Sequence, residues 1–472
     1  MKLKAIAGAA ALGLLATVQA QAFAPTDAPD FVFYTGGGSA QGAAFLAFAQ
    51  KLMTSFDTYT DVACGTQGAN YRAVYGTMAA TLPDGSAMPA TLAGKKVFIE
   101  YGNNGGTFAN GINGLARSVA IPFVNYINAQ GTNNTTACAT GAGGTNYTTA
   151  ATGTPTVANR VPLVGMSDEE VTLFSGTNLP AATTALTATE LTKIATFPLF
   201  VNVFGVAETN ALALQKKNFS KFELTAIEAG LVTNWNQLKG DVGAFAGVSL
   251  PSGPIVFMDR NSGSGSKAAW NQYFLHNPGS KAFGGQLAPK VSTGGNVGDC
   301  TNYTVYSDCP KSSNGNVKAG LNDAQSKATP VRAVGLLGLE FQPAGTDGYQ
   351  FGNVNGVDIS GTTAVTCGNA VANPFEPANV VSGAHDLAFT NSVQFRTANV
   401  GGQPFNGDGS ASSDFMDAFI AAASDPKTEV SVPGVLLDPD VAGTPPTGGT
   451  YDACIMRGTR HQNSTAPLQL VF

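Results

Sequence analysis

Charged side chains are scarce in this sequence. Asp, Glu, Lys and Arg together make up 12% of its 472 residues, and the formal net charge is only −6. Proteins that recognise nucleic acids carry a basic surface that attracts the phosphate backbone. This chain does not offer such a composition, so we expect no nucleic-acid partner.

Histidine is rarer still, and the few cysteines form no metal-binding pattern. His276, His385 and His461 are far apart, and no CxxC pair or Cys/His cluster of the zinc-binding kind occurs. There is no G-x-S-x-G nucleophile elbow in the predicted strand–turn–helix units. The GSGSK run ending at Lys267 lacks the spacing of a nucleotide-binding P-loop. We therefore predict no metal, no cofactor and no catalytic residues, and hence a protein that is not an enzyme.

Long apolar runs are also missing, apart from one near the amino terminus. Lys2 and Lys4 precede an apolar run from Ile6 to Val18, and small residues offer cleavage sites near Ala20 and Ala24. This pattern is typical of a secretory signal peptide, here residues 1–24, and the run is too short to span a bilayer. No cysteine follows the cleavage site, so we expect no lipid anchor. The sequence predicts a periplasmic or secreted protein that does not span the membrane.

An even set of cysteines in an exported protein favours disulfides. Cys300 and Cys309 are close enough to close a local loop. Elimination then pairs Cys64 with Cys138 and Cys367 with Cys454.

Glycine, by contrast, is abundant, with 57 residues, and much of it follows short apolar runs. Repeated strand–turn–helix units predict an α/β fold with parallel strands and ligand-facing loops at their carboxyl ends. The predicted strands are residues 30–34, 95–101, 161–168, 197–206, 255–258 and 331–341, with further strands in 379–397. The predicted helices are residues 43–53, 107–117, 224–231, 266–275 and 412–423. Less regular or inserted segments are expected near 54–94, 130–158, 278–328, 343–378 and 425–455.

The stretch 255–275 carries the clearest chemistry. A short apolar run reaches Arg260, turns through Gly263 and Gly265, and continues as a helix. Free N–H groups at a helix start, serine hydroxyls and a guanidinium together form an oxyanion site. Taken alone, the same stretch also fits a Gly-Ser loop that caps an ordinary helix.

Four turns of this chemical character occur in order: TGGGSA at 35–40, GNNGG at 102–106, GMSD at 165–168 and RNSGSGS at 260–266. This order resembles the periplasmic phosphate-binding proteins of ABC transporters (PstS-like, type II solute-binding proteins). The segments from Ile227 to Asn236, from Ala333 to Glu340 and from Val381 to Leu387 are also similar to segments of that family. The resemblance covers most of the chain except the inserted segments.

The resemblance implies a two-lobed periplasmic-binding-protein (type II) fold. Each lobe would be a mixed, mostly parallel sheet flanked by helices, with hinge strands between the lobes and long loop inserts. Residues 25–200 would begin the first lobe, 201–341 would form the second, and 342–472 would return to the first. Carried over by position, the ligand shell would consist of Ser39, Ala40, Asn104, Asp168, Arg260, Ser264, Gly265 and Ser266.

Asp168 would select the ligand within that shell. Phosphate near neutral pH keeps a proton that a carboxylate can accept, whereas sulfate has none and would face an unpaired buried charge. A site built around one required hydrogen bond can disfavour an analogue that lacks this bond, relative to the ligand that makes it, by a factor on the order of 10⁴. Without the resemblance, Asp168 also fits a surface acid that caps the following segment.

The sequence therefore predicts an exported, monomeric protein that binds inorganic phosphate, or a similar protonated oxyanion such as arsenate, and serves an ABC permease. Two other hypotheses stay open. One is a secreted or cell-surface scavenging or structural relative with weak or altered binding. The other is an exported phosphatase, which the lack of metal-ligand clusters disfavours.

Overall fold

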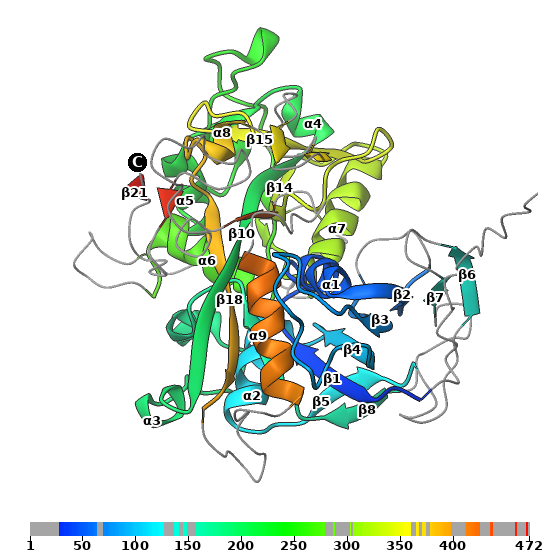
Figure 1. Cartoon of the computed structure of the whole chain (residues 1–472). Coiled ribbons are helices and arrows are strands. Elements are labelled where there is room, and N and C mark those ends of the chain that lie inside the picture. The colour runs from blue at the N-terminus through cyan, green and yellow to red at the C-terminus, as the bar shows by residue number, and fades with distance from the viewer. Residues whose placement is uncertain are drawn as a thin grey trace, which may run out of the picture.

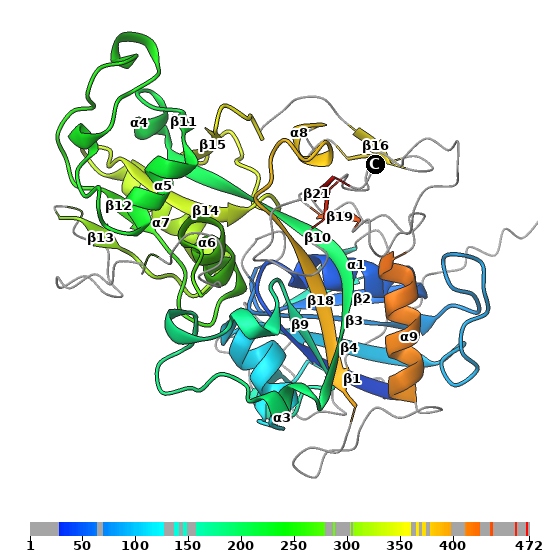
Figure 2. The ribbon, with the colours of Figure 1, turned by 90° about the vertical axis from the view of Figure 1, so that its left-hand side faces the viewer.

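The computed structural model describes residues 28–63, 69–126, 136–140, 145–148, 157–278, 287, 303, 305–359, 365–367, 371–373, 378–397, 411–424, 435–437, 458–459 and 469–470. The predicted signal peptide lies outside these residues. Within them the protein is a mixed α/β structure in which a large sheet is flanked by helices. Two halves are joined along the long strand β10 (Ile194–Thr209) and its partner β18 (Ala388–Arg396) (Figures 1 and 2).

The first half is built on a sheet whose centre is parallel. β1 pairs in parallel with β4 and with β9, while β3 and β2 continue the sheet antiparallel beyond β4. Its strands are β1 (Phe31–Gly36), β2 (Met53–Thr60), β3 (Tyr71–Met78), β4 (Lys96–Gly102), β6 (Thr136–Thr140), β7 (Thr145–Thr148) and β9 (Val164–Ser167). Because β1, β4 and β9 run the same way, the turns that follow them meet at one edge of the sheet.

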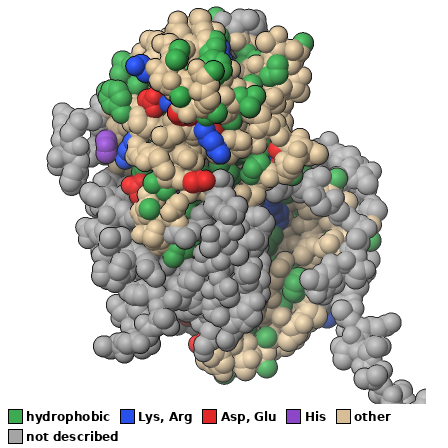
Figure 3. Space-filling view, turned by 90° about the horizontal axis from the view of Figure 1, so that it is seen from above, with side chains coloured by type: hydrophobic (Ala, Val, Ile, Leu, Met, Phe, Trp, Pro, Cys, Tyr) green, Lys and Arg blue, Asp and Glu red, His purple; other side chains and the backbone are tan. Residues whose placement is uncertain are grey.

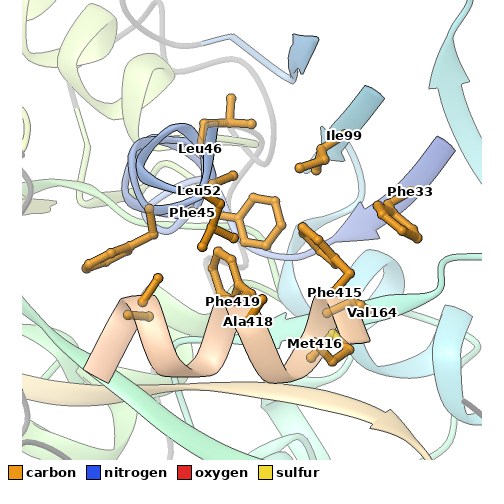
Figure 4. Close-up of a cluster of buried hydrophobic side chains, with 14 of the residues drawn as sticks. Phe33, Phe45, Leu46, Leu52, Ile99, Val164, Phe415, Met416, Ala418 and Phe419 are labelled. Atoms are coloured by element: carbon orange, nitrogen blue, oxygen red, sulfur yellow. The ribbon is translucent and has the colours of Figure 1, made fainter. Parts of the chain in front are cut away.

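Helices α1 (Gly42–Lys51) and α9 (Ala411–Ser424) pack together over one face of this sheet. Phe45 of α1 lies with its ring centroid 4.6 Å from that of Phe419, and Phe415 stacks on Phe33 of β1 (Figure 4). Both helices present their apolar side chains inwards, as the predicted helical spacing requires. This aromatic layer fixes α1, and with it the turn that precedes α1.

A smaller core covers the other side of the same sheet. The π-helical turn η1 (Thr107–Asn113) runs into α2 (Gly114–Ala116) and packs its Phe108 and Ile112 with Val171 and Phe174. Ala268, from a helix of the second half, is part of the same cluster. The two halves are therefore in direct contact beside the turns.

The second half has its own mixed sheet. β12 pairs in parallel with β13 and β14, and β14 and β15 pair antiparallel with the last part of β10. Besides the last part of β10, its strands are β11 (Asn218–Phe219), β12 (Val256–Met258), β13 (Ser307–Asp308), β14 (Ala333–Gly338) and β15 (Tyr349–Val354). Together with the first half they confirm the predicted α/β class.

Helices cover both faces of the second sheet. α5 (Lys221–Glu228) and α6 (Gly265–Leu275) pack on one face, where Trp270 lies against Phe257 and Phe274. α7 (Asn314–Ser326) packs on the other through Val317 and Leu321. α6 is buried along its whole length.

β10 and β18 belong to both halves. Residues 194–203 of β10 pair antiparallel with β18, and residues 204–209 pair with β14 and β15. Phe200 packs into the aromatic core of the first half, whereas Val203 packs into a core of the second. Strands shared in this way are the expected hinge between two bodies.

Two interpretations of the sequence need comment. The segment 54–94 was expected to be irregular, but most of β2 and all of β3 lie within it and belong to the main sheet of the first half. β15 pairs with the second-half end of β10, so part of the predicted return segment 342–472 packs with the second half, while α9 returns to the first. The domain limits themselves stay a prediction.

Shorter elements complete the described chain. They are β5 (Ile121–Val124), β8 (Val157–Arg160), η4 (Val171–Leu173), η5 (Gly176–Asn178), α3 (Ala188–Leu191), α4 (Asn210–Ala213), η6 (Trp235–Gln237), η7 (Gly243–Phe245), β16 (Val365–Cys367), β17 (Val371–Asn373), α8 (Ala378–Val381), β19 (Val435–Leu437), β20 (Gly458–Thr459) and β21 (Gln469–Leu470).

Cys309 is buried and disulfide-bonded. The predicted partner, Cys300, lies outside the described residues, so the three predicted pairings stay predictions. In the part of the chain that the structure describes, no helix is both long and apolar enough to cross a membrane.

Candidate functional site

The amino-terminal end of α6 lies where a buried parallel strand ends. β12 is flanked on both sides by parallel partners, and the chain leaves it through Asp259 and Arg260. Gly263 then adopts a φ of +91°, a conformation that side chains other than glycine rarely take. Ser264 precedes the helix but makes no capping hydrogen bond with its side chain. The first N–H groups of α6 are therefore left for partners outside the helix.

Asp168 faces this helix end from the first half. It follows β9, is buried, and its Oδ1 accepts a hydrogen bond of 2.8 Å from the hydroxyl of Thr107. The same hydroxyl oxygen accepts a bond of 3.0 Å from the N–H of Gly265. Thr107 thus links the carboxylate of one half to the helix end of the other.

Burial raises the pKa of Asp168 above its usual value, while the Thr107 hydrogen bond, a backbone N–H and the charge of Arg260 oppose that rise. A buried carboxylate favours its neutral form, or a partner that brings a proton to it. Asp168 is therefore suited to accept a hydrogen bond from a protonated anion.

Arg260 is buried, and both of its terminal nitrogens have partners. Nη1 donates to Ser266 Oγ at 3.3 Å and to Asn314 Oδ1, and Nη2 donates to the carbonyl of Ser312 at 3.2 Å. Its Nε donates to the carbonyl of Lys311 at 3.2 Å. Burial lowers its pKa to about 10, and the carboxylates of Asp168 and Glu340 oppose the decrease. Arg260 therefore stays a fixed cation at neutral pH.

The first glycine turn lies between the halves. Gly38 donates its N–H to Gln41 Oε1 at 2.7 Å, and the Tyr101 hydroxyl donates to the carbonyl of Gly38 at 2.7 Å. These bonds hold the turn in place. Ser39 Oγ accepts a long bond of 3.4 Å from the backbone N–H of Asn314, and the side chain of Ala40 packs into a core of the second half.

The second glycine turn carries Asn104 and is followed by Thr107. Asn104 is exposed and its side chain hydrogen-bonds Tyr71. The buried hydroxyl near this turn comes instead from Thr107, directly after Gly106. Ser39, Asp168, Arg260, Gly265 and Ser266 are connected through the contacts above, and Ser264 is buried at the start of α6.

Two further residues were missed by the sequence analysis. Asn314, the first residue of α7, contacts Ser39 and Arg260 and donates from Nδ2 to Glu340 Oε1 at 3.0 Å. Its helix lies in the segment 278–328, which was interpreted as an insert. A helix-start signal was nevertheless present, because Ser313 precedes apolar residues at helical spacing (Val317 and Leu321). A sequence signal for Thr107 was present, because it is the hydroxyl residue that directly follows Gly105 and Gly106 at the start of the predicted helix.

The chemical character of the site is a fixed cation, helix-start N–H groups, hydroxyls and the raised-pKa carboxyl of Asp168. Among the described residues, no group of three or more His, Cys, Asp or Glu side chains could hold a metal ion. On the face shown in Figure 3, lysines, arginines and acids are scattered rather than gathered by sign. The arrangement suits a single small oxyanion more than an extended polyanion.

The fold and site together define a two-halved α/β protein with a candidate oxyanion site between the halves. No protein-family model matches the chain, and no curated protein is similar in sequence. A solved structure of a candidate phosphate ABC transporter substrate-binding protein with bound phosphate from Clostridium perfringens is 14% identical. It has a TM-score of 0.41 and covers 84% of this chain and 94% of its own.

Two other solved structures show lower similarity. An ABC-type phosphate transport receptor from Vibrio cholerae is 14% identical, with a TM-score of 0.31 and coverage of 56% of this chain and 75% of its own. PstS from Borrelia burgdorferi is 14% identical, with a TM-score of 0.28 and coverage of 56% and 74%. These scores are too low to establish a family or a ligand.

Proposed function

We propose that this protein binds inorganic phosphate, or a similar protonated oxyanion, between its two halves and does not transform it. The observation that carries the proposal is the connection of Asp168, Thr107 and Gly265 across the halves, next to the buried Arg260. A raised-pKa carboxyl, a helix start and a fixed guanidinium are complementary to an anion that still carries a proton.

Each group would have a distinct role. The N–H groups at the start of α6 donate to anion oxygens and place the positive end of the helix dipole beside them. Arg260 supplies the formal positive charge, and the hydroxyls of Ser266 and Ser39 can donate further bonds. Asp168 accepts the proton of the ligand. Ala40, Asn104 and Ser264 remain proposed members of the shell.

The broader role is also a proposal. The signal-like amino terminus and the sequence resemblance to phosphate-binding proteins support an exported, monomeric protein that delivers its ligand to an ABC permease. The two halves joined by β10 and β18 are compatible with closure around a ligand.

Isothermal titration calorimetry with phosphate tests the binding. Arg260→Ala removes the fixed cation, and we expect a loss of affinity of about a hundredfold or more, because a buried charge-assisted contact is lost. Arg332→Ala is the matched control, since Arg332 also donates to backbone carbonyls, at Pro251 and Ser252, but in an exposed loop. Absence of phosphate binding by the unaltered protein, or equal binding by Arg260→Ala, would contradict the proposal.

A further inference from the structure

A second carboxylate lies beside Arg260, on the side of the second half. Glu340 follows β14 and accepts a hydrogen bond of 3.0 Å from Asn314 Nδ2. The Oδ1 atom of the same amide accepts a bond from Arg260 Nη1. The amide of Asn314, which is fully buried, therefore lies between the guanidinium and the Glu340 carboxylate and contacts both.

Glu340 also faces the first half. Of the charged groups around it, Arg260 follows β12 in the second half, whereas Arg72 lies on β3 in the first. The charge of Asp168, from the first half, also acts on Arg260. Arg260 thus lies in the field of two carboxylates, one from each half. Asp168 also contacts the start of α6.

The Glu340 side chain lies close to the backbone of β14 at Gly338. A Cβ on Gly338 would lie 1.9 Å from Glu340 Oε2, so only a glycine at 338 allows the carboxylate to fold back over the strand end. Burial raises the pKa of Glu340 to about 7, and the hydrogen bond from Asn314 and the charges of Arg72 and Arg260 oppose the rise. Its charge therefore changes near neutral pH.

We propose that Glu340 is a positioning residue that couples oxyanion binding at Arg260 to the uptake of one proton from solvent. An anion held by Arg260 brings negative charge towards the ionised Glu340, and like charges at short range disfavour each other. Protonation of one Glu340 oxygen removes the repulsion. The other oxygen can still accept the hydrogen bond from Asn314, so the amide keeps its orientation towards Arg260.

The roles of the two carboxylates differ. Asp168 accepts the proton that the ligand carries, which decides which anion binds. Glu340 takes a proton from solvent, which decides how affinity varies with pH. The inference rests on the proposed function, because it requires an anion at Arg260.

The test compares phosphate affinity in the unaltered protein and in Glu340→Gln across pH. Glutamine keeps the size of the side chain and the acceptor for Asn314 but has no charge at any pH. The ratio of the two dissociation constants cancels the titration of phosphate itself and of Asp168. Near about pH 6 we expect a ratio close to one, and by about pH 8 we expect Glu340→Gln to bind about tenfold more tightly.

Glu208→Gln is the matched control. Glu208 is buried in the second half, has a pKa raised by burial to about 8, and hydrogen-bonds Gln350 rather than a site residue. Its ratio of dissociation constants should stay constant over the same pH range. A pH-dependent ratio for Glu208→Gln as large as that for Glu340→Gln would overturn the assignment to Glu340.

Calorimetry in two buffers of different ionisation enthalpy gives a second readout, the number of protons taken up on binding. The unaltered protein should take up more protons near pH 8 than Glu340→Gln does, by up to about one. Equal uptake, or a constant affinity ratio at every pH, would overturn the inference while phosphate binding stands. Absence of phosphate binding by the unaltered protein would instead overturn the proposed function itself.

Discussion

The carboxylate of Asp168 lies directly against the Cα of Gly265, at the start of α6. A Cβ on Gly265 would lie 1.3 Å from Asp168 Oδ1. Thr107 holds the carboxylate there and receives the N–H of Gly265. Glycine at 265 is thus required by the close approach of the two halves.

Gly265→Ala should impair binding for this reason. The added methyl group would displace the Asp168 carboxylate or separate the halves, so we expect phosphate affinity to fall by about tenfold or more, as for a lost buried hydrogen bond to a charged group. Gly345→Ala is the control, because a Cβ at Gly345 meets no atom within 4 Å. Unchanged phosphate affinity in Gly265→Ala, measured by calorimetry, would show that this contact is not part of the site.

Thr107→Val should separate the role of the hydroxyl from that of the side-chain volume. Valine keeps the shape but leaves Asp168 and the Gly265 N–H without their shared partner, at a cost of about 1–3 kcal/mol in unfolding free energy. Thr107→Ser keeps the hydroxyl and should retain most of the stability and affinity. Denaturant unfolding of both variants checks this. Equal losses in the two would mean that packing, not the hydroxyl, matters at 107.

Stability should also depend on pH through Glu208. Its pKa is about 8 in the folded protein, above the usual value of 4.5, because burial disfavours the charged form. The folded state thus holds this proton more tightly than the unfolded chain does. Stability should therefore fall as pH rises from about 4.5 to about 8, by up to about 1.4 kcal/mol per pH unit from this group.

Glu208→Gln should flatten that part of the pH profile. Urea unfolding at several pH values in this window measures the slope for the unaltered protein and the variant. The same slope in both would show that the pKa of Glu208 is not raised in the folded protein.

The strand–turn–helix units around the site could be predicted because the pattern that indicates each unit lies within a short stretch of sequence. Short apolar runs correctly indicated β1, β4, β9 and β12, and the glycine turns after β1 and β12 correctly indicated the helices α1 and α6. The same apolar runs placed Asp168 and Arg260 at strand ends, where the structure brings them near each other. Local periodicity is enough for such elements.

Other features depended on partners far away in the chain. β2 and β3 read as irregular because Asp57, Thr58 and Arg72 interrupt their apolar pattern, although the strands pair with each other and with β4. Asn314 lies in a glycine- and asparagine-rich region whose proximity to Ser39 and Arg260 is set by packing of α7 on the second sheet. The contact of Thr107 with Asp168 depends on the turn geometry, which spacing alone does not reveal.

Competition between phosphate and sulfate in the unaltered protein and in Asp168→Asn tests the central claim most directly. We predict that the unaltered protein binds phosphate and rejects sulfate by a factor on the order of 10⁴. Asp168→Asn should lose most of this discrimination, because asparagine can donate a hydrogen bond to the unprotonated anion. Asp61→Asn, at a partly buried carboxyl with a raised pKa, should retain it. Unchanged discrimination in Asp168→Asn, or sulfate binding as tight as phosphate binding in the unaltered protein, would contradict the account.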